Sequence, residues 1–464
     1  MSKNVWASYD EKTLKEVELL NERYKDYLNR GKTERECVSI IVDDLKKLGY
    51  QDLNDLKAQG HALAAGDKIY YCHMDKSLAI WEIGSEPLET GMNILGAHID
   101  SPRIDVKQNP LYESEDFAYL DTHYYGGIRK YQWLTIPLAI HGVVCKKDGS
   151  TVQIALGEKD DDPKFVITDL LPHLAQNQVK KTVSDAFEGE TLDLLIGSKP
   201  LAGDDGDQDK DKKKVRENIL ALLKDQYDID EDDFLSAELE IVPAGKACDC
   251  GLDRSMIMAY GQDDRVCAFT SFFAMTEVAA GKRTNCCILV DKEEIGSVGA
   301  TGMHSLFFEH AIAELAVMEG HDPSLTVARC LQNSRMLSSD VNAAYDPLYP
   351  DVFEKRSASF CGHGLGFNKF TGSRGKSGSN DANAEYIAFL RRILDEDGVS
   401  YQFAELGKVD IGGGGTIAYI MANYGMNVID SGVAVLSMHS PWEVTSKADV
   451  YEAYRGYKSF LKSE

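Results

Sequence analysis

The stretch from residue 288 to residue 302 constrains the fold of this chain more than any other. Residues 288–290, Ile-Leu-Val, form a short apolar run that ends in charge, which is typical of a buried strand in a parallel sheet. Glu293 and Glu294 follow at the carboxyl end of that run, where open α/β sheets bind their ligands. One carboxylate can ligate a metal ion while the other acts on a water that the ion holds. The alternative is a solvated pair of glutamates, and these residues alone do not decide between the two.

Further acidic or histidine residues stand where other apolar, strand-like runs end. In the run 92–105, the spacing His98-x-Asp100 places both side chains on one face of an extended segment. Asp100 can therefore fix the imidazole of His98 as a metal ligand, whereas the alternative for His98 is a histidine without that role. The remaining residues of this kind are Asp263, Asp340 and His439.

Together these residues match what a pair of divalent ions requires. Two histidines and three carboxylates give each ion one imidazole and one carboxylate, and a third carboxylate bridges ions that lie roughly 3.5–4 Å apart. Nitrogen and oxygen donors without thiolate favour zinc, cobalt or manganese over an iron–sulfur cluster. The sequence therefore predicts two divalent metal ions in an α/β framework, held by stretches that are far apart in the chain.

The chain is long enough for two domains. At 464 residues it exceeds one average domain. Aromatic and β-branched segments between residues 112 and 243 indicate a β-rich insertion, so we expect a catalytic domain in two parts, 1–103 and 245–464, around an inserted domain at 104–244. Within the insertion, residues 203–214 contain almost no apolar side chain and predict a solvated loop.

Local patterns predict the main elements. Apolar residues at helical spacing indicate two helices within 10–48, and residues 68–84 are typical of a strand hairpin. Beyond these we predict helices at 215–224, 266–280, 306–318 and 382–395, a strand at 235–242 and a helix that opens at 411–416. In the run 433–443 we predict a last strand that ends in His439, followed by a final amphipathic helix.

Charge and composition disfavour several partners. Fifty basic against 75 acidic residues give a formal net charge of -25, which argues against nucleic acid and anionic membranes. Residues 1–20 lack the apolar core of a secretory signal, and no run approaches the length that crosses a bilayer. The ten cysteines lack zinc-site spacing, so we expect reduced thiols in a cytoplasmic protein.

Six motifs follow one another along nearly the full length of the chain: Gly-Ala-His-Ile-Asp-Ser-Pro-Arg at 96–103, Asp-Asp-Arg at 263–265, Glu-Glu-Ile-Gly-Ser at 293–297, Ser-Asp at 339–340, Gly-Thr at 415–416 and Met-His-Ser at 438–440. Their order resembles the M18 family of metallo-aminopeptidases, the family of aspartyl aminopeptidase. The resemblance implies a zinc-peptidase-like α/β catalytic domain, with a mixed sheet flanked by helices, and an inserted β-rich dimerisation domain.

The resemblance also implies a metal-binding role for five residues. His98 and Asp340 ligate one ion. Glu294 and His439 ligate the other ion. Asp263 bridges the two ions, and a hydroxide held between them is the nucleophile.

By the same resemblance, Glu293 is the general base, which deprotonates the bridging water and passes the proton to the leaving amine. Asp100 orients His98. Asp264 is the alternative bridging residue, although we expect it to form a buried salt bridge with Arg265 instead.

Substrate recognition is less closely specified. Lys369 aligns with a family lysine in the pocket for the N-terminal side chain, which acid-specific members require and members that prefer neutral residues do not. Arg374 or Lys376 could take part or be solvated. The glycine run that ends at Gly415 and Thr416 lacks the ending of a phosphate-binding loop, so we expect it to bind the peptide or its oxyanion.

The resemblance implies self-association through the inserted domain, with dimers that assemble into dodecamers. It also implies that His141 reaches the active site of a neighbouring subunit, whereas the alternative for His141 is a core histidine in a strand. We therefore expect a cytoplasmic metallo-aminopeptidase that removes an acidic or neutral N-terminal residue from peptides.

Two alternatives to that function stay open. One is another amidohydrolase on the same scaffold, a deacylase or carboxypeptidase, which would still act on peptides whose N-terminus is blocked. The other is a self-assembling scaffold that has lost its chemistry, although such a shell needs none of the histidines and carboxylates described above.

Overall fold

The computed structural model describes residues 3–201, 214–375 and 378–464. The loop predicted at 203–214 lies outside these residues except for Lys214, and so does Lys376. The described chain forms two compact units. Unit 1 comprises Met1–Ser101, Ala247–Met438 and Glu443–Glu464, and unit 2 comprises Pro102–Lys246 and His439–Trp442. The predicted division into a catalytic and a dimerisation domain stays a prediction.

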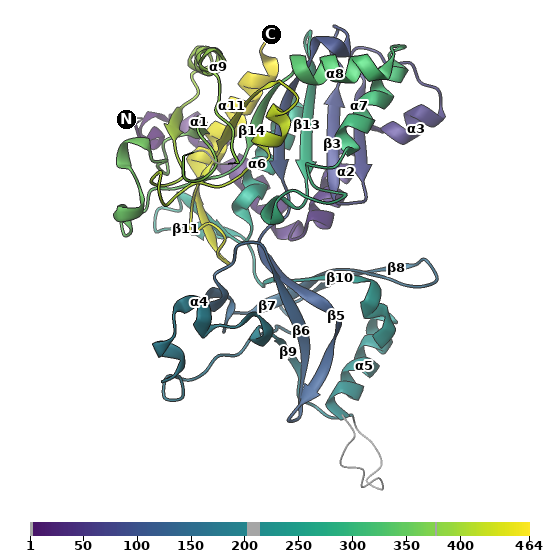
Figure 1. The fold of residues 1–464 in the computed structure, drawn as a ribbon, viewed down its shortest axis with the longest axis vertical. Helices are drawn as coiled ribbons and strands as arrows, with labels where there is room; N and C mark the ends of the chain where they lie inside the picture. The colour runs from purple at the N-terminus through teal and green to yellow at the C-terminus, as the bar shows by residue number, and fades with distance from the viewer. Residues whose placement is uncertain (1–2, 202–213, 376–377) are drawn as a thin grey trace. The chain divides into compact units, whose positions relative to one another are not determined.

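Unit 1 is built on a nine-stranded mixed sheet flanked by helices (Figure 1), so the predicted fold class is confirmed. In spatial order its strands are β1 (Gln51–Asp52), β2 (Lys68–His73), β3 (Ser77–Glu82), β13 (Thr284–Val290), β4 (Met92–His98), β14 (Arg335–Ser339), β18 (Asn427–Gly432), β16 (Leu365–Asn368) and β17 (Tyr401–Ala404). The strands β13, β4, β14 and β18 pair in parallel. Because both faces of these strands are covered, they read as nearly continuous apolar runs.

The register of the parallel strands brings their carboxyl ends to one edge of the sheet. Val290 at the end of β13 lies opposite His98, the last residue of β4. Ser338 in β14 lies opposite Gly96, two residues before His98. Asp340, two residues beyond Ser338, therefore follows at the level of His98. We call this side of the sheet the carboxyl edge.

Two hydrophobic cores lie on the two faces of the sheet. The first core packs α1 (Glu11–Arg30), α2 (Glu34–Lys47), α6 (Gln262–Glu277), α9 (Ala384–Glu396) and α11 (Lys447–Lys462). The second packs α3 (Leu53–Ala58), α7 (Phe307–Met318), α8 (Pro323–Asn333) and α10 (Ala418–Ala422). Figure 1 shows α7 and α8 on the face away from α6 and α11.

The sequence located most of these helices. The predicted helices are confirmed within a few residues by α1, α2, α6, α7 and α9, and the predicted hairpin is formed by β2 and β3. The helix α8 was not predicted. Its start nevertheless has a local cause, because Asp322 caps the N-H of Ser324 and Pro323 occupies the first turn.

A second sheet in unit 1 has five strands in the order β11 (Cys248–Cys250), β12 (Met256–Ala259), β20 (Glu443–Ser446), β19 (Ala434–Leu436) and β15 (Asn342–Ala343). The prediction of a last strand that ends in His439 was wrong in its end. The strand β19 ends at Leu436, and β20 pairs back against it. Ser437 and His439 adopt φ angles of 59° and 64°, which a continuous strand excludes.

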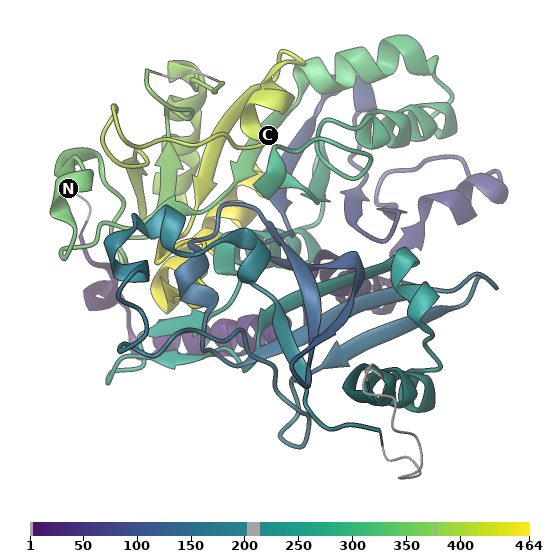
Figure 2. The same cartoon turned by 60° about the horizontal axis from the view of Figure 1, so that its bottom comes forward.

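Unit 2 is the β-rich part of the chain. Its antiparallel sheet has the order β8 (Thr151–Leu156), β7 (Leu138–Cys145), β10 (Ala237–Pro243), β5 (Arg103–Ser114), β6 (Phe117–Tyr125) and β9 (Leu194–Gly197). The strands β5 and β6 form a long hairpin (Figure 2), whose register shifts between Val106 and Leu111. Pro110 lies in that irregular stretch, where a residue without an N-H is tolerated.

The helix predicted at 215–224 corresponds to α5 (Lys214–Tyr227), and the strand predicted at 235–242 corresponds to β10. Both predictions are confirmed. Over the residues that the structure describes, no helix combines the length and the apolar character that a membrane crossing requires.

Candidate active site

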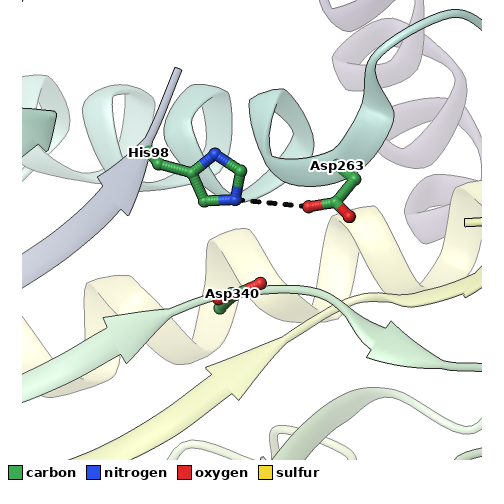
Figure 3. A group of neighbouring side chains, drawn as sticks. All are labelled: His98, Asp263 and Asp340. Carbon is green, nitrogen blue, oxygen red and sulfur yellow. Dashed lines mark ion pairs between the residues drawn. The ribbon is translucent and has the colours of Figure 1, made fainter. Parts of the chain in front are cut away.

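His98 ends β4 at the carboxyl edge and is 2% exposed. Its Nδ1 lies 3.0 Å from the carbonyl oxygen of Asp100, an atom that can only accept a hydrogen bond, so Nδ1 carries the proton. In the neutral ring Nε2 then keeps its lone pair, and it lies 3.3 Å from Oδ1 of Asp263 (Figure 3). This is the tautomer that a metal ligand requires, with the other ring nitrogen fixed by the protein.

Asp263 lies in an irregular segment before the regular part of α6. Gly261 opens the segment with φ 68°, and a Cβ there would lie 2.4 Å from the guanidinium of Arg265, so this position favours glycine. Asp263 has φ -80° and ψ 109°, which is not helical, and its peptide bond to Asp264 is cis. Its N-H donates to Oε2 of Glu443 at 3.0 Å.

Neighbouring side chains hold this segment at the end of β4. Ser101 Oγ donates to the carbonyl of Asp263 at 2.8 Å. Asp264 Oδ2 accepts the backbone N-H of His98 at 3.4 Å, and burial raises the pKa of the Asp264 carboxyl well above its usual value. Arg265 donates to Ser101 Oγ and to the carbonyls of Gly31 and Lys32. The predicted pairing of Asp264 with Arg265 stays a prediction.

Glu293 and Glu294 lie in the short helix η7 (Glu293–Ile295), just beyond β13. Their backbone N-H groups donate to Oδ1 and Oδ2 of Asp100, each at 3.2 Å. Asp100 therefore holds both glutamates by their backbone in addition to contacting His98, a second task that the sequence did not indicate. Oε2 of Glu293 lies 3.9 Å from Nε2 of His98, so this carboxylate faces the same ring atom as Asp263.

Asp340 follows β14, and its backbone N-H donates to the carbonyl of Ser431 at 3.3 Å. A Cβ on Gly432 would lie 2.1 Å from the carbonyl oxygen of Asp340, so glycine is needed for β18 to pass this closely. The backbone beside β18 thus sets the position from which the Asp340 side chain reaches His98 and Asp263 (Figure 3).

The structure brings together five residues that the sequence singled out. Ligand atoms of His98, Asp263 and Asp340 all lie within 4.8 Å of one another, and so do those of His98, Glu293 and Glu294. Among these five residues, only the histidine offers nitrogen, and all others offer carboxylate oxygen. This is a donor set that zinc, cobalt or manganese accepts.

The electrostatics of the group favour a cation. Burial lowers the pKa of the His98 imidazole, but hydrogen bonds to Asp100 and Asp263 and the charge of Glu293 outweigh burial and hold that pKa well above its usual value. The pKa of Asp340 is also raised well above its usual value, first by burial and then by the charges of Asp264 and Glu293. Carboxylates that crowd one another in this way are stabilised when a divalent cation is bound between them, so the residues fit a metal centre.

His439 and His141 belong to unit 2. His439 follows Met438, the last residue of a unit 1 segment. Its Nδ1 lies 3.1 Å from the carbonyl of Gly127. His141 lies in β7, is 3% exposed, and has Nε2 3.2 Å from Oε1 of Glu158. The predicted roles of both histidines stay predictions.

Lys369 follows β16, which runs antiparallel to β18. Because β18 ends at the carboxyl edge, β16 runs away from that edge. Asn368 pairs with Asp430, so Lys369 stands several residues back from the level of His98. Lys369 lines a cavity of about 690 Å³ with Phe370 and with residues of α9 and β17.

Gly415 and Thr416 precede α10. A Cβ on Gly96 would lie 3.4 Å from Cδ1 of Ile417, so the segment after Thr416 packs on β4 two residues before His98. The hydroxyl of Thr416 accepts the N-H of Ala418 at 3.2 Å. It also contacts Asp430, whose pKa burial raises to about 7. The glycine run therefore leads into a segment that lies near the carboxyl edge.

Sequence reasoning did not find the outer residues that hold the centre in place. Ser101, Glu443 and Gly432 contact the backbone of predicted site residues rather than the site itself. Ser101 belongs to the motif at 96–103, but Glu443 follows the predicted last strand and belongs to none of the six motifs. Nothing in the local pattern of residues indicated that Glu443 reaches a segment 180 positions away.

An imidazole and several carboxylates that converge at the carboxyl edge of a mixed α/β sheet are typical of a metal-dependent hydrolase. Comparison with known proteins identifies the family of hydrolases to which the chain belongs. The model of the family "Aminopeptidase I zinc metalloprotease (M18)" matches residues 27–461. The chain belongs to the M18 family, as the motifs had indicated, and is a zinc aminopeptidase, a hydrolase of peptide bonds.

Similar proteins match over nearly their whole lengths. A probable M18 family aminopeptidase 1 of Clostridium acetobutylicum is 58% identical over 99% of this chain and 98% of its own length. The crystal structure of aminopeptidase I from that organism has a TM-score of 0.92 and 56% identity, with 99% of both chains covered. That of an M18 family aminopeptidase from Thermotoga maritima has a TM-score of 0.94 and 42% identity, with both chains fully covered.

Proposed function

We propose that the enzyme holds two divalent ions, zinc in the first place, and removes single residues from the N-terminus of peptides. His98 and Asp340 would ligate one ion, Glu294 and His439 would ligate the other, and Asp263 would bridge them. The observation that carries this proposal is the convergence of His98, Asp263 and Asp340 within 4.8 Å.

Ions bound there polarise the scissile carbonyl and acidify a water molecule. Glu293 takes up the proton of the attacking water at its carboxylate and then delivers it to the nitrogen of the leaving amine. Its position supports this role, since Oε2 faces the same Nε2 atom of His98 that the ligand Asp263 faces. Asp100 holds the backbone of Glu293 and the ring of His98, so it fixes the base relative to the ligand.

Gly415 and Thr416 bind the peptide backbone near the scissile bond. Packing of Ile417 on Gly96 supports this role, because it ties the end of the glycine run to β4. Backbone N-H groups on such a run can stabilise negative charge on the carbonyl oxygen as it develops.

Glu293→Gln tests the assignment of the base. The variant keeps the size of the side chain but cannot take up a proton, so kcat should fall at least about 100-fold, the lower range for a lost general base. Zinc content, measured by elemental analysis, should stay unchanged because Glu293 is not a ligand in this scheme. Glu86→Gln makes the same change at an exposed position and should leave both measurements unchanged. A near-normal kcat in Glu293→Gln would remove Glu293 from its role.

For specificity, we propose that neutral N-terminal residues are preferred over acidic ones. The direction of β16 supports this choice, because Lys369 follows that strand as it runs away from the carboxyl edge. In a panel of aminoacyl-anilides, the leucyl compound should show a higher kcat/KM than the glutamyl compound. Lys369→Ala should leave that ratio unchanged. A strong glutamyl preference that Lys369→Ala abolishes would restore Lys369 as the cation of the pocket.

We also propose that the chain self-associates through residues 104–244, with dimers building a dodecamer and His141 serving a neighbouring active site. A protein with the same fold, mApe1 of Saccharomyces cerevisiae at 20% identity, forms a dodecamer. In this chain, part of unit 2 exposes apolar side chains well suited to a contact between copies: Leu170, Leu171, Leu174, Val179 and Val183.

Light scattering tests this assembly. The mass should be many times the 51.4 kDa of one chain. His141→Ala should lower kcat without changing that mass, because the histidine acts in the site and does not build the contact. A fully active monomer would contradict the shared site.

A further inference from the structure

Glu443 is a buried carboxylate to which the mechanism above gives no task. It is 1% exposed, opens β20, and accepts the N-H of Asp263 at its Oε2 atom, at 3.0 Å. We propose that Glu443 is a positioning residue: it holds the backbone of Asp263 so that the side chain of Asp263 points into the metal centre. The inference rests on the proposed role of Asp263 as the bridging ligand.

The backbone at Asp263 needs such an anchor. Asp263 and Asp264 are not helical, so regular helix hydrogen bonds do not fix them, and a buried N-H must find another acceptor. Glu443 supplies that acceptor at the N-H of Asp263, and Ser101 supplies a donor at its carbonyl.

Glu443 is itself held in place by the residue before Asp263. Gln262, which is 0% exposed, donates from Nε2 to the carbonyl of Glu443 at 2.7 Å and to that of Ile257 at 3.2 Å. Its Oε1 accepts the hydroxyl of Thr445 at 2.7 Å. The carbonyl of Glu443 therefore holds Gln262, and its side chain holds Asp263. In this way β20 fixes two successive residues of the segment.

If Glu443 only stabilised the fold, a neutral hydrogen-bond acceptor would serve equally well at this position. Another buried carboxylate next to a cluster of carboxylates adds repulsion unless cations are present. A carboxylate at this place therefore suits a centre that is occupied by metal ions, because nearby cations favour its ionised form. The two roles differ in what they affect: a structural role changes the free energy of unfolding alone, and a positioning role also changes metal affinity.

The test compares zinc affinity in variants of the full chain after removal of metal, by competition with a chromophoric chelator. Glu443→Gln keeps the shape and lacks the charge, and Glu443→Ala lacks the acceptor. The zinc Kd should rise about 10-fold for Glu443→Gln and about 100-fold for Glu443→Ala, the range found when residues behind metal ligands are removed. The absorption spectrum of the cobalt-loaded protein should shift in the same order. A Kd for Glu443→Gln within about twofold of the parent would overturn the proposal.

Asp449→Asn is the matched control, because it also replaces a buried carboxylate that accepts backbone N-H groups. Asp449 accepts those of Gly362 at 2.6 Å and Gly364 at 2.7 Å, away from the candidate ligands. It should lower the free energy of unfolding without changing the zinc Kd. An equal rise in Kd for Asp449→Asn and Glu443→Gln would show a general effect of lost stability, and would overturn the positioning role.

Asp263→Asn separates this inference from the proposed function. If Asp263→Asn leaves zinc affinity unchanged, the bridging role fails and the role of Glu443 fails with it. If Asp263→Asn weakens zinc binding and Glu443→Gln does not, only the positioning role fails. Should Glu443→Ala not fold, the isosteric Glu443→Gln still gives the decisive measurement.

Discussion

Crowded negative charge is the constraint on which the rest of unit 1 depends. Four carboxylates surround one buried imidazole at the carboxyl edge of the sheet, and burial together with the charges of Asp264 and Glu293 holds the pKa of Asp340 well above its usual value. Without metal, the raised pKa of His98 lets its imidazolium supply part of the missing positive charge. Two divalent ions would supply all of that positive charge. Metal binding would therefore explain why the carboxylates are crowded, whereas folding alone does not.

The sheet determines where the imidazole and the carboxylates lie, and hydrogen bonds from neighbouring side chains hold their backbone in place. Parallel pairing with matched registers brings the ends of β4, β13 and β14 to one level. His98 ends β4, and Asp340 and Glu294 follow β14 and β13, whereas Asp263 lies in the irregular start of α6. Glu294 and Asp263 lie outside regular strand pairing, so their backbone polar groups need other partners. Asp100, Ser101 and Glu443 supply those partners from other segments. The precision of the site therefore comes from hydrogen bonds between segments as much as from the sheet itself.

The sequence predicted the parts of the fold that depend on local residue patterns. Apolar runs that end in charge identified β4, β13 and β14, and helical spacing identified α6 and α7. What it could not supply was long-range pairing. The order of the nine strands places β13 next to β4 although nearly two hundred residues separate them, and no local pattern encodes that choice.

The same limit explains the differences at the site. His439 was expected at a strand end, but positive φ angles at Ser437 and His439 turn the chain after β19. Lys369 lies back from the carboxyl edge because β16 runs antiparallel to β18. That orientation depends on a pairing between strands that are distant in the sequence. Motif order, by contrast, identified the family, because chemistry restricts which residue types can serve at each of those positions.

The proposed mechanism requires one dinuclear centre assembled around Asp263. Diffraction from crystals of the zinc-loaded enzyme, recorded at the zinc absorption edge, tests that claim most directly. It should show two anomalous peaks, one beside His98 and Asp340 and one beside Glu294 and His439, with the carboxylate of Asp263 touching both. A single peak, or a pair of peaks remote from Asp263, would contradict it.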